Sequence, residues 1–225
     1  MDGQRTLEGV ARVSPEPRHL DHHRSKRLID LVLASVLLVA LLPLLIVISV
    51  AIAIDSPGTI LYVQPRAGYR GEVFRMLKFR TMHPDRRVRR VPIPFPERRK
   101  SLKVKHDPRI TRVGHVLRRL SLDELPQLIN VLHGDMSFVG PRPELPELVA
   151  QYGSLHYARH QMLPGVTGWW QTHGRCTRPD GCDTQTDLAT KLADDIYYMQ
   201  HWSLSLDVKI LLLTVPVVLR GPGAN

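Results

Sequence analysis

Residues 31–54 read LVLASVLLVALLPLLIVISVAIAI, a run of 24 positions without a charged side chain. A straight α-helix of this length would extend about 36 Å, which is enough to cross the hydrocarbon core of a bilayer. Both the apolar run and the region before it are longer than in a cleavable signal peptide. The stretch therefore predicts a membrane segment that the chain retains.

Pro43 lies near the middle of this stretch, where it removes one backbone hydrogen bond and crowds the preceding turn. A kinked spanning helix and a re-entrant helix that enters and leaves by the same face both fit this position. Both flanks are basic, with three Lys or Arg at 24–27 and four at 66–78. Because positively charged flanks stay on the cytoplasmic side, the charge pattern favours the re-entrant helix.

The chain has 225 residues, of which 43% are hydrophobic, and a formal net charge of +10. Only two cysteines are present, which excludes a small secreted module held by disulfides. Between residues 66 and 119 there are 18 Lys or Arg and four Asp or Glu, so the excess charge belongs to the middle third. Anionic partners are expected, namely phosphorylated substrates, an anionic membrane surface or nucleic acid. No DNA-reading motif, glycine-rich phosphate loop or Ser-His-Asp signature is recognisable.

After the membrane segment, residues 60–64 and 72–79 have strand-like composition and predict a short hairpin, with its turn at 66–71. The basic, proline-interrupted region 83–105 predicts a loop, either simply solvated or in contact with anionic lipid headgroups. Apolar spacing and flanking residues predict helices near 113–120, 125–132, 144–151 and 187–198. The apolar tail 206–219 is too short to span a membrane, so it should lie at an interface or pack on the core.

Two adjacent carboxylates, Asp123 and Glu124, are the first chemical candidates. A capping box with Ser121 as N-cap would explain Glu124 structurally. Pro126 argues against that register because proline prefers the first turn, so the helix is expected to begin near 123–125. Both carboxylates would then lie at the helix entrance, where the dipole keeps a carboxylate ionised, as a nucleophile or a magnesium ligand requires.

Arginines surround this pair in the sequence. Arg142 follows it, between two prolines that stiffen the backbone. A guanidinium binds phosphate through two parallel hydrogen bonds, so carboxylates, arginines and a membrane segment together predict phosphate chemistry on a lipid. The structural alternative for Arg142 is a turn with an exposed arginine. The arginines that precede the pair are Arg109, Arg112, Arg118 and Arg119.

Cys176 and Cys182, with His173 nearby, are a weak metal candidate because their spacing fits no standard zinc pattern.

The chain resembles the bacterial sugar transferases, which are monotopic polyprenyl-phosphate phosphoglycosyl transferases, over about residues 24–215. The resemblance rests on an ordered set of motifs, none of which is specific alone. These motifs are Lys26–Asp30, Asp55–Gly58, Lys78–Met82, Asp107–Gly114, Ser121–Val131, Gly134–Pro143 and Pro164–Trp169.

The resemblance implies transfer of a sugar 1-phosphate from a UDP-sugar to undecaprenyl phosphate, with Mg²⁺ required and UMP released. It implies that Asp123 attacks the sugar-bearing phosphate and forms a covalent intermediate. Glu124 would assist with the metal or the incoming lipid phosphate, which makes Asp123 and Glu124 the metal candidates. The expected phosphate-binding residues are Arg142, Arg118, Lys78 and Arg112.

The implied architecture is α+β and mostly α. A polar tail at 1–23 precedes a re-entrant membrane helix at 24–57, broken at Pro43. Residues 58–225 form a small catalytic region with interfacial amphipathic helices on the cytoplasmic face of the bacterial inner membrane. The expected partners are the UDP-sugar, undecaprenyl phosphate and the lipid bilayer, without nucleic acid.

The chain departs from the family at residues 168–175, which read GWWQTHGR in place of the usual GWAQVNGR. This difference leaves the sugar undefined. Two alternatives remain open, namely a non-catalytic, membrane-anchored basic adaptor and an ordinary glycosyltransferase that releases UDP. The acidic pair favours the transferase, because a surface for nucleic acid or acidic lipid has no use for carboxylates beside its arginines.

Overall fold

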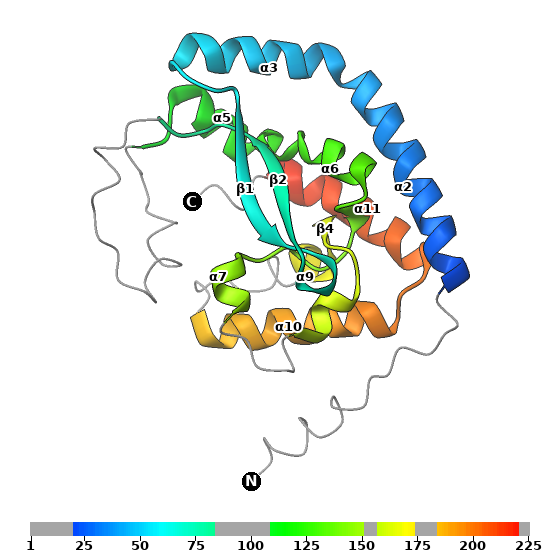
Figure 1. The fold of residues 1–225 in the computed structure, drawn as a ribbon. Helices are drawn as coiled ribbons and strands as arrows, with labels where there is room; N and C mark the ends of the chain where they lie inside the picture. Colours follow the sequence, from blue (N-terminus) through cyan, green and yellow to red (C-terminus); the bar gives the residue numbers. More distant parts are fainter. Residues whose placement is uncertain (1–19, 84–108, 151–156, 174–183, 221–225) are drawn as a thin grey trace.

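The computed structural model describes residues 20–83, 109–150, 157–173 and 184–220 (Figure 1). Helices predominate among them, and the strands form two small sheets of two strands each, so the expected mostly helical class is confirmed. The long helices are α2 (Leu20–Ala40), α3 (Leu42–Asp55), α10 (Thr184–Gln200) and α11 (Leu204–Arg220). The short helices are α5 (Arg112–Arg119), α6 (Gln127–His133), α7 (Pro146–Val149) and α9 (Trp169–His173). The 3-10 turns are η3 (Tyr69–Gly71), η5 (Leu122–Glu124) and η6 (Ala158–Gln161).

The apolar stretch folds as two helices, α2 and α3, which meet at a bend of 61°. No single helix in the described part of the chain is long and apolar enough to cross a membrane, whereas Arg24–Ala40 and α3 together meet that test by length and composition. Pro43 lies in the first turn of α3, where a missing N–H costs least. The break expected at Pro43 is therefore found beside it, at Leu41.

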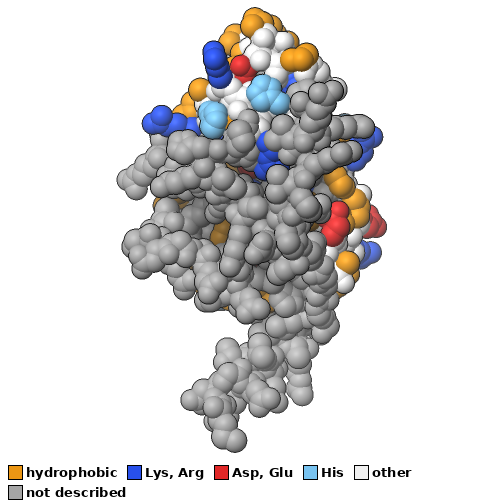
Figure 2. All heavy atoms as spheres, turned by 90° about the vertical axis from the view of Figure 1, so that its left-hand side faces the viewer, with side chains coloured by type: hydrophobic (Ala, Val, Ile, Leu, Met, Phe, Trp, Pro, Cys, Tyr) orange, Lys and Arg blue, Asp and Glu red, His pale blue; other side chains and the backbone are white. Residues whose placement is uncertain are grey.

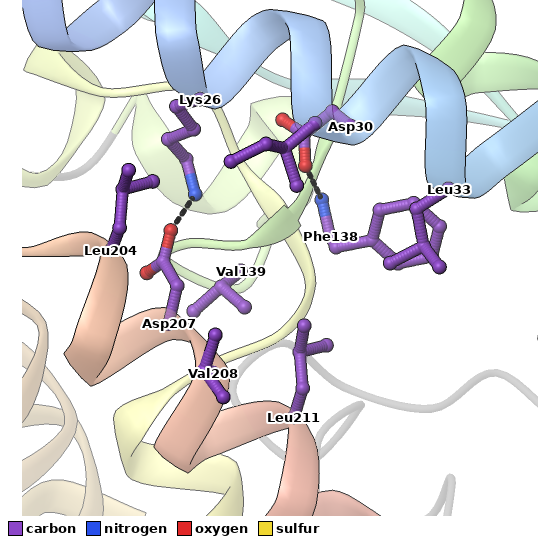
Figure 3. Close-up of a pocket in the computed structure, with 10 residues that line it drawn as sticks. Lys26, Asp30, Leu33, Phe138, Val139, Leu204, Asp207, Val208 and Leu211 are labelled. Carbon is purple, nitrogen blue, oxygen red and sulfur yellow. Dashed lines mark hydrogen bonds and ion pairs between the residues drawn. The ribbon is translucent and has the colours of Figure 1, made fainter.

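The N-terminal half of α2 is fixed to α11 (Figure 3). The buried Lys26 ammonium donates to the Asp207 carboxylate, and Asp30 accepts a hydrogen bond from the Phe138 backbone N–H at 3.2 Å. Arg27 donates to the carbonyl of Leu132 at 2.9 Å. The charged residues of the first motif thus attach α2 to the helices and strand beside it.

The hairpin pairs β1 (Leu61–Ala67) with β2 (Val73–Phe79) in antiparallel register, and Leu61 faces Phe79. The strand predicted to end at Gln64 continues to Ala67, so the prediction that Arg66 lies in the turn is wrong. Pro65 does not end the strand, because a two-stranded sheet consists of edge strands, where proline is tolerated. The turn is η3, closed by Gly71 at a φ of 78°.

Strands β3 (Ser137–Val139) and β4 (Gly165–Thr167) pair in parallel and lie against the main core. Fully buried side chains of α6, β3, α10 and α11 form this core, among them Val131, Tyr198 and Ile210. On α11, Ile210 packs inward while Val208, Leu212 and Val215 are exposed. The apolar tail therefore has one face in the core and one face free.

A second, smaller core joins α3 to α5 and η5. Ile48 and Ile52 of α3 pack there with Phe79 and Leu117, and Leu122 and Leu125 adjoin them. The turn that carries the two carboxylates therefore packs against the same small core as α3.

The other predicted helices are found close to their expected bounds. α6 ends at Gly134, whose φ of 97° provides the left-handed C-cap. In α5, Thr111 caps the N-terminus by accepting from the Gly114 N–H at 2.9 Å. Only the short α7 forms in the predicted 144–151 region. The predicted loop at 83–105 lies outside the described residues, apart from His83.

Candidate active site

Asp123 and Glu124 lie on η5, a single 3-10 turn between α5 and α6. Ser121 precedes it at a φ of 55° and its side chain makes no capping hydrogen bond, so the capping-box alternative is wrong. The helix start predicted at 123–125 is also wrong, because α6 begins at Gln127 with Pro126 as its N-cap. The turn that presents the carboxylates thus ends at Leu125, and Pro126 begins the helix behind it.

Glu124 is held between two cations from distant parts of the chain. Its Oε1 lies 2.7 Å from Lys78 Nζ on β2 and 3.6 Å from Arg142 Nη2, in the loop after β3. All three side chains are partly buried, with relative exposures of 15% for Lys78, 33% for Arg142 and 23% for Glu124. Two cations on one carboxylate leave net positive charge, which suits an anionic substrate.

Asp123 has a different environment from its neighbour. Burial raises the pKa of the Asp123 carboxyl, and the charge of Glu124 adds to that rise, whereas Lys78 and Arg118 act in the opposite direction. The helix expected to lower the pKa of this carboxyl starts later, at Gln127, and desolvation outweighs the neighbouring cations. The two carboxyls consequently differ, since Glu124 is paired with cations and the pKa of the partly buried Asp123 is raised.

The loop that carries Arg142 is rigid for reasons beyond its two prolines. Gly165 N–H donates to the Pro141 carbonyl at 2.9 Å, and Arg159 Nη2 donates to the Arg142 carbonyl at 3.0 Å. Gly140 lies so close to the next segment that a Cβ there would sit 2.4 Å from the Leu163 carbonyl oxygen. The Arg142 backbone is therefore set by contacts from η6, from β4 and from the short connection between them.

Arg159 is itself held by a buried carboxylate. Its Nη2 lies 2.6 Å from Asp195 Oδ2 on α10, and its Nη1 lies 3.6 Å from Glu144 Oε1. Burial raises the pKa of Asp195 to about 6, although the Arg159 charge opposes the rise. The carboxylate that supports the Arg142 loop therefore titrates close to neutrality.

This gives a pH prediction for stability. The folded chain binds the Asp195 proton more tightly than an exposed aspartate does, so its unfolding free energy falls as pH rises from about 4 to about 6. The Asp195→Asn variant lacks this slope. Between pH 4.5 and 7 we expect the wild type to lose about 2 kcal/mol relative to that variant. Chemical denaturation in one detergent at both pH values measures the difference, and parallel profiles would contradict it.

The structure brings some of the predicted phosphate-binding residues together and leaves one apart. Lys78 and Arg142 meet at Glu124, and the charge of Arg118 acts on Asp123. Arg118 also donates from Nε to Thr81 Oγ1 at 2.8 Å. Arg112 is exposed at the start of α5, and its charge acts on the carboxyl of Asp55.

The structure describes only some of the residues predicted to bind a metal. Cys176 and Cys182 lie outside the described residues, and so does the side chain of His173. Within the described residues no three His, Cys, Asp or Glu side chains gather as a metal site. Asp123 and Glu124 alone still suit Mg²⁺, which commonly takes one or two carboxylates and completes its coordination with substrate phosphates and water.

The sequence argument missed Arg66 and Arg159. Arg66 shares a small pocket with Lys78, Glu124 and Arg142, and the hairpin alternation could have revealed it, since Gln64 and Arg66 point to one face. Arg159 carried no comparable signal, because only the packing of η6 on α10 makes it a buried residue.

The chain belongs to the bacterial sugar transferase family, whose sequence model matches residues 21–221. This membership confirms both the family and the class of enzyme predicted from the motifs. The match includes α2, α3, the hairpin, η5 and the Arg142 loop.

Three relatives illustrate the similarity. An undecaprenyl-phosphate glucose phosphotransferase of Komagataeibacter xylinus is 42% identical over 84% of this chain and 35% of its own length. The exopolysaccharide production protein ExoY of Sinorhizobium fredii is 39% identical over 89% of this chain and 88% of its own. A UDP-glucose:undecaprenyl-phosphate glucose-1-phosphate transferase of Caulobacter vibrioides is 42% identical over 88% and 71%. The chain thus spans about a third of the first relative and most of the other two.

Proposed function

We propose that this chain transfers a sugar 1-phosphate from a UDP-sugar to undecaprenyl phosphate and releases UMP, as the first membrane step of a surface polysaccharide pathway. The observation that carries the proposal is the pairing of a partly buried carboxyl of raised pKa, Asp123, with a carboxylate held by Lys78 and Arg142. The names of the relatives support the donor and the acceptor.

In the first step, an Asp123 carboxylate oxygen attacks the sugar-bearing phosphorus. The bond from that phosphorus to the bridging oxygen breaks, and its electron pair leaves with UMP. Lys78 lies close enough to act on both carboxyls, so it can orient the attacked phosphate beside Asp123.

In the second step, an oxygen of undecaprenyl phosphate attacks the same phosphorus. The bond to the Asp123 oxygen breaks, which restores the carboxylate and completes the diphosphate product. Covalent catalysis divides the transfer into two displacements at one site. Mg²⁺ held by Asp123 and Glu124 would neutralise substrate phosphate charge.

We place α2 and α3 in the cytoplasmic leaflet of the bacterial inner membrane as a re-entrant pair. The bend and the exposed side chains of both helices support this placement, including Val39 at 73% and Ile54 at 82% exposure. Figure 2 shows hydrophobic side chains at the end of the molecule where α3 lies, with Lys, Arg and His side chains next to them. Cations beside an apolar surface favour anionic headgroups.

Nucleotide release tests the reaction directly. Detergent-solubilised protein, Mg²⁺ and undecaprenyl phosphate are mixed with a panel of UDP-sugars, beginning with UDP-glucose. We expect UMP release that depends on the lipid and on one sugar. Release of UDP would instead identify an ordinary glycosyltransferase, and the absence of nucleotide from every donor would favour a non-catalytic adaptor.

The re-entrant pair gives a topology prediction. A tag at residue 1 and a tag at residue 225 should both be protected from a membrane-impermeant reagent added to intact cells. Both should become reactive after the inner membrane is permeabilised. Labelling of the N-terminal tag alone in intact cells would show a spanning helix and contradict the placement.

A further inference from the structure

Arg66 is a cation in the pocket whose hydrogen bonds, within the described part of the chain, go to neutral groups. Its Nη1 donates to the Pro143 carbonyl at 3.2 Å and its Nη2 to Gln64 Oε1 at 2.9 Å. Its Nε is buried and has no hydrogen-bond partner among the described residues. No described carboxylate lies within 4 Å of the guanidinium, although Glu144 and Glu124 act on it from further away.

The pocket carries more positive than negative charge. Arg66, Lys78 and Arg142 line it with a single carboxylate, Glu124, so the formal balance of its charged lining is +2. Arg142 lies close enough to Arg66 to lower the pKa of that guanidinium, after the larger effect of burial. Two neighbouring guanidinium groups repel each other unless an anion lies between them. The diphosphate bridge of a nucleotide sugar carries two negative charges, which matches this balance.

The pocket also connects Arg66 with the turn that carries Asp123. Asp123 directly precedes Glu124 on η5, and Lys78, which lies 2.7 Å from Glu124, also acts on the Asp123 carboxyl. Arg66 lines the same pocket as Lys78 and Glu124, beside Arg142. In an in-line displacement the attacked and leaving groups lie on opposite sides of the transferred phosphorus. The phosphate next to Asp123 is the one attacked, so the leaving phosphate lies toward Arg66.

We propose that Arg66 and Arg142 together bind the phosphate of the donor that departs with the nucleotide, and that Arg66 stabilises the charge formed there when the diphosphate bond breaks. This inference rests on the proposed function, because it assumes a nucleotide diphosphate donor. Arg66 contributes its guanidinium charge to the pocket lining, and its contacts to Pro143 and Gln64 hold the guanidinium plane in place. Lysine at this position would keep the charge but lacks the paired N–H donors of the planar guanidinium.

Binding of inorganic pyrophosphate and of UMP to the purified full-length chain tests this assignment without turnover. We expect Arg66→Gln to weaken both ligands at least 10-fold and Arg66→Lys to recover only part of the loss. In the donor assay, Arg66→Gln should lower kcat/KM at least 10-fold. The matched control is Arg75→Gln, because Arg75 is exposed on the other strand of the same hairpin and should bind both ligands as the wild type does.

Thermal unfolding establishes that the variants are folded. Arg66→Lys, which preserves the charge and most of the volume, provides the test if Arg66→Gln does not fold. Unchanged affinity of a folded Arg66 variant for both ligands would overturn the assignment while leaving the proposed reaction intact. A different result is that the wild type binds pyrophosphate, Arg66→Gln does not, and no donor yields UMP. This would support the anion site and reject the proposed reaction.

Discussion

Asp123→Asn is expected to abolish sugar-phosphate transfer, with a fall in turnover of about 1,000-fold or more, the scale seen when a nucleophile is removed. The amide cannot form the acyl phosphate, yet it nearly preserves the shape of the side chain. Because burial already raises the pKa of Asp123, a neutral amide should be accepted there without loss of stability. Lipid-dependent UMP release measures the effect.

Trapping separates a covalent role from a purely electrostatic one. With a donor labelled in its sugar-bearing phosphate and no lipid acceptor, the wild-type chain should retain label that hydroxylamine removes, and Asp123→Asn should retain none. Glu147→Gln is the matched control, since Glu147 is an exposed carboxylate on α7 and should behave as the wild type. Turnover at the wild-type rate by Asp123→Asn would exclude the covalent mechanism.

Arg142→Ala is expected to lower kcat/KM by about 100- to 1,000-fold, the usual loss when one donor to a developing charge is removed. The variant also leaves the Glu124 carboxylate with Lys78 as its remaining close cation among the pocket residues. Arg142→Lys should restore part of the rate, because an ammonium keeps the charge but not the paired hydrogen bonds. Initial rates over a range of donor concentrations measure both.

The backbone of the Arg142 loop should survive this change. It is held through the Pro141 and Arg142 carbonyls, which the substitution leaves in place. Arg75→Ala, an exposed arginine of the hairpin, controls for the loss of one positive charge. If the rate of Arg142→Ala depends on donor concentration in the same way as the wild-type rate, the phosphate contact is contradicted.

Much of the fold follows from local sequence. The break beside Pro43, the caps at Thr111 and Gly134 and the apolar spacing of α5 and α6 are all set by neighbouring residues. The motifs also identify the candidate nucleophile, because the acidic pair and the proline-flanked arginine occur in an ordered series. Local rules failed at Arg66, which strand pairing places in β1, and near Pro126, where α6 begins later than proline preference indicates.

Within the described chain, sequence alone thus determined the helices, the break between α2 and α3 and the residue types at the site. Only the tertiary structure decided which of them meet. Lys78 and Glu124 are 46 positions apart, and Arg66 was assigned to a turn until the hairpin placed it in the pocket. The same holds for the pKa of Asp123, which follows from burial by segments that are not its neighbours in sequence. Contact and desolvation depend on distances in space, which residue spacing does not specify.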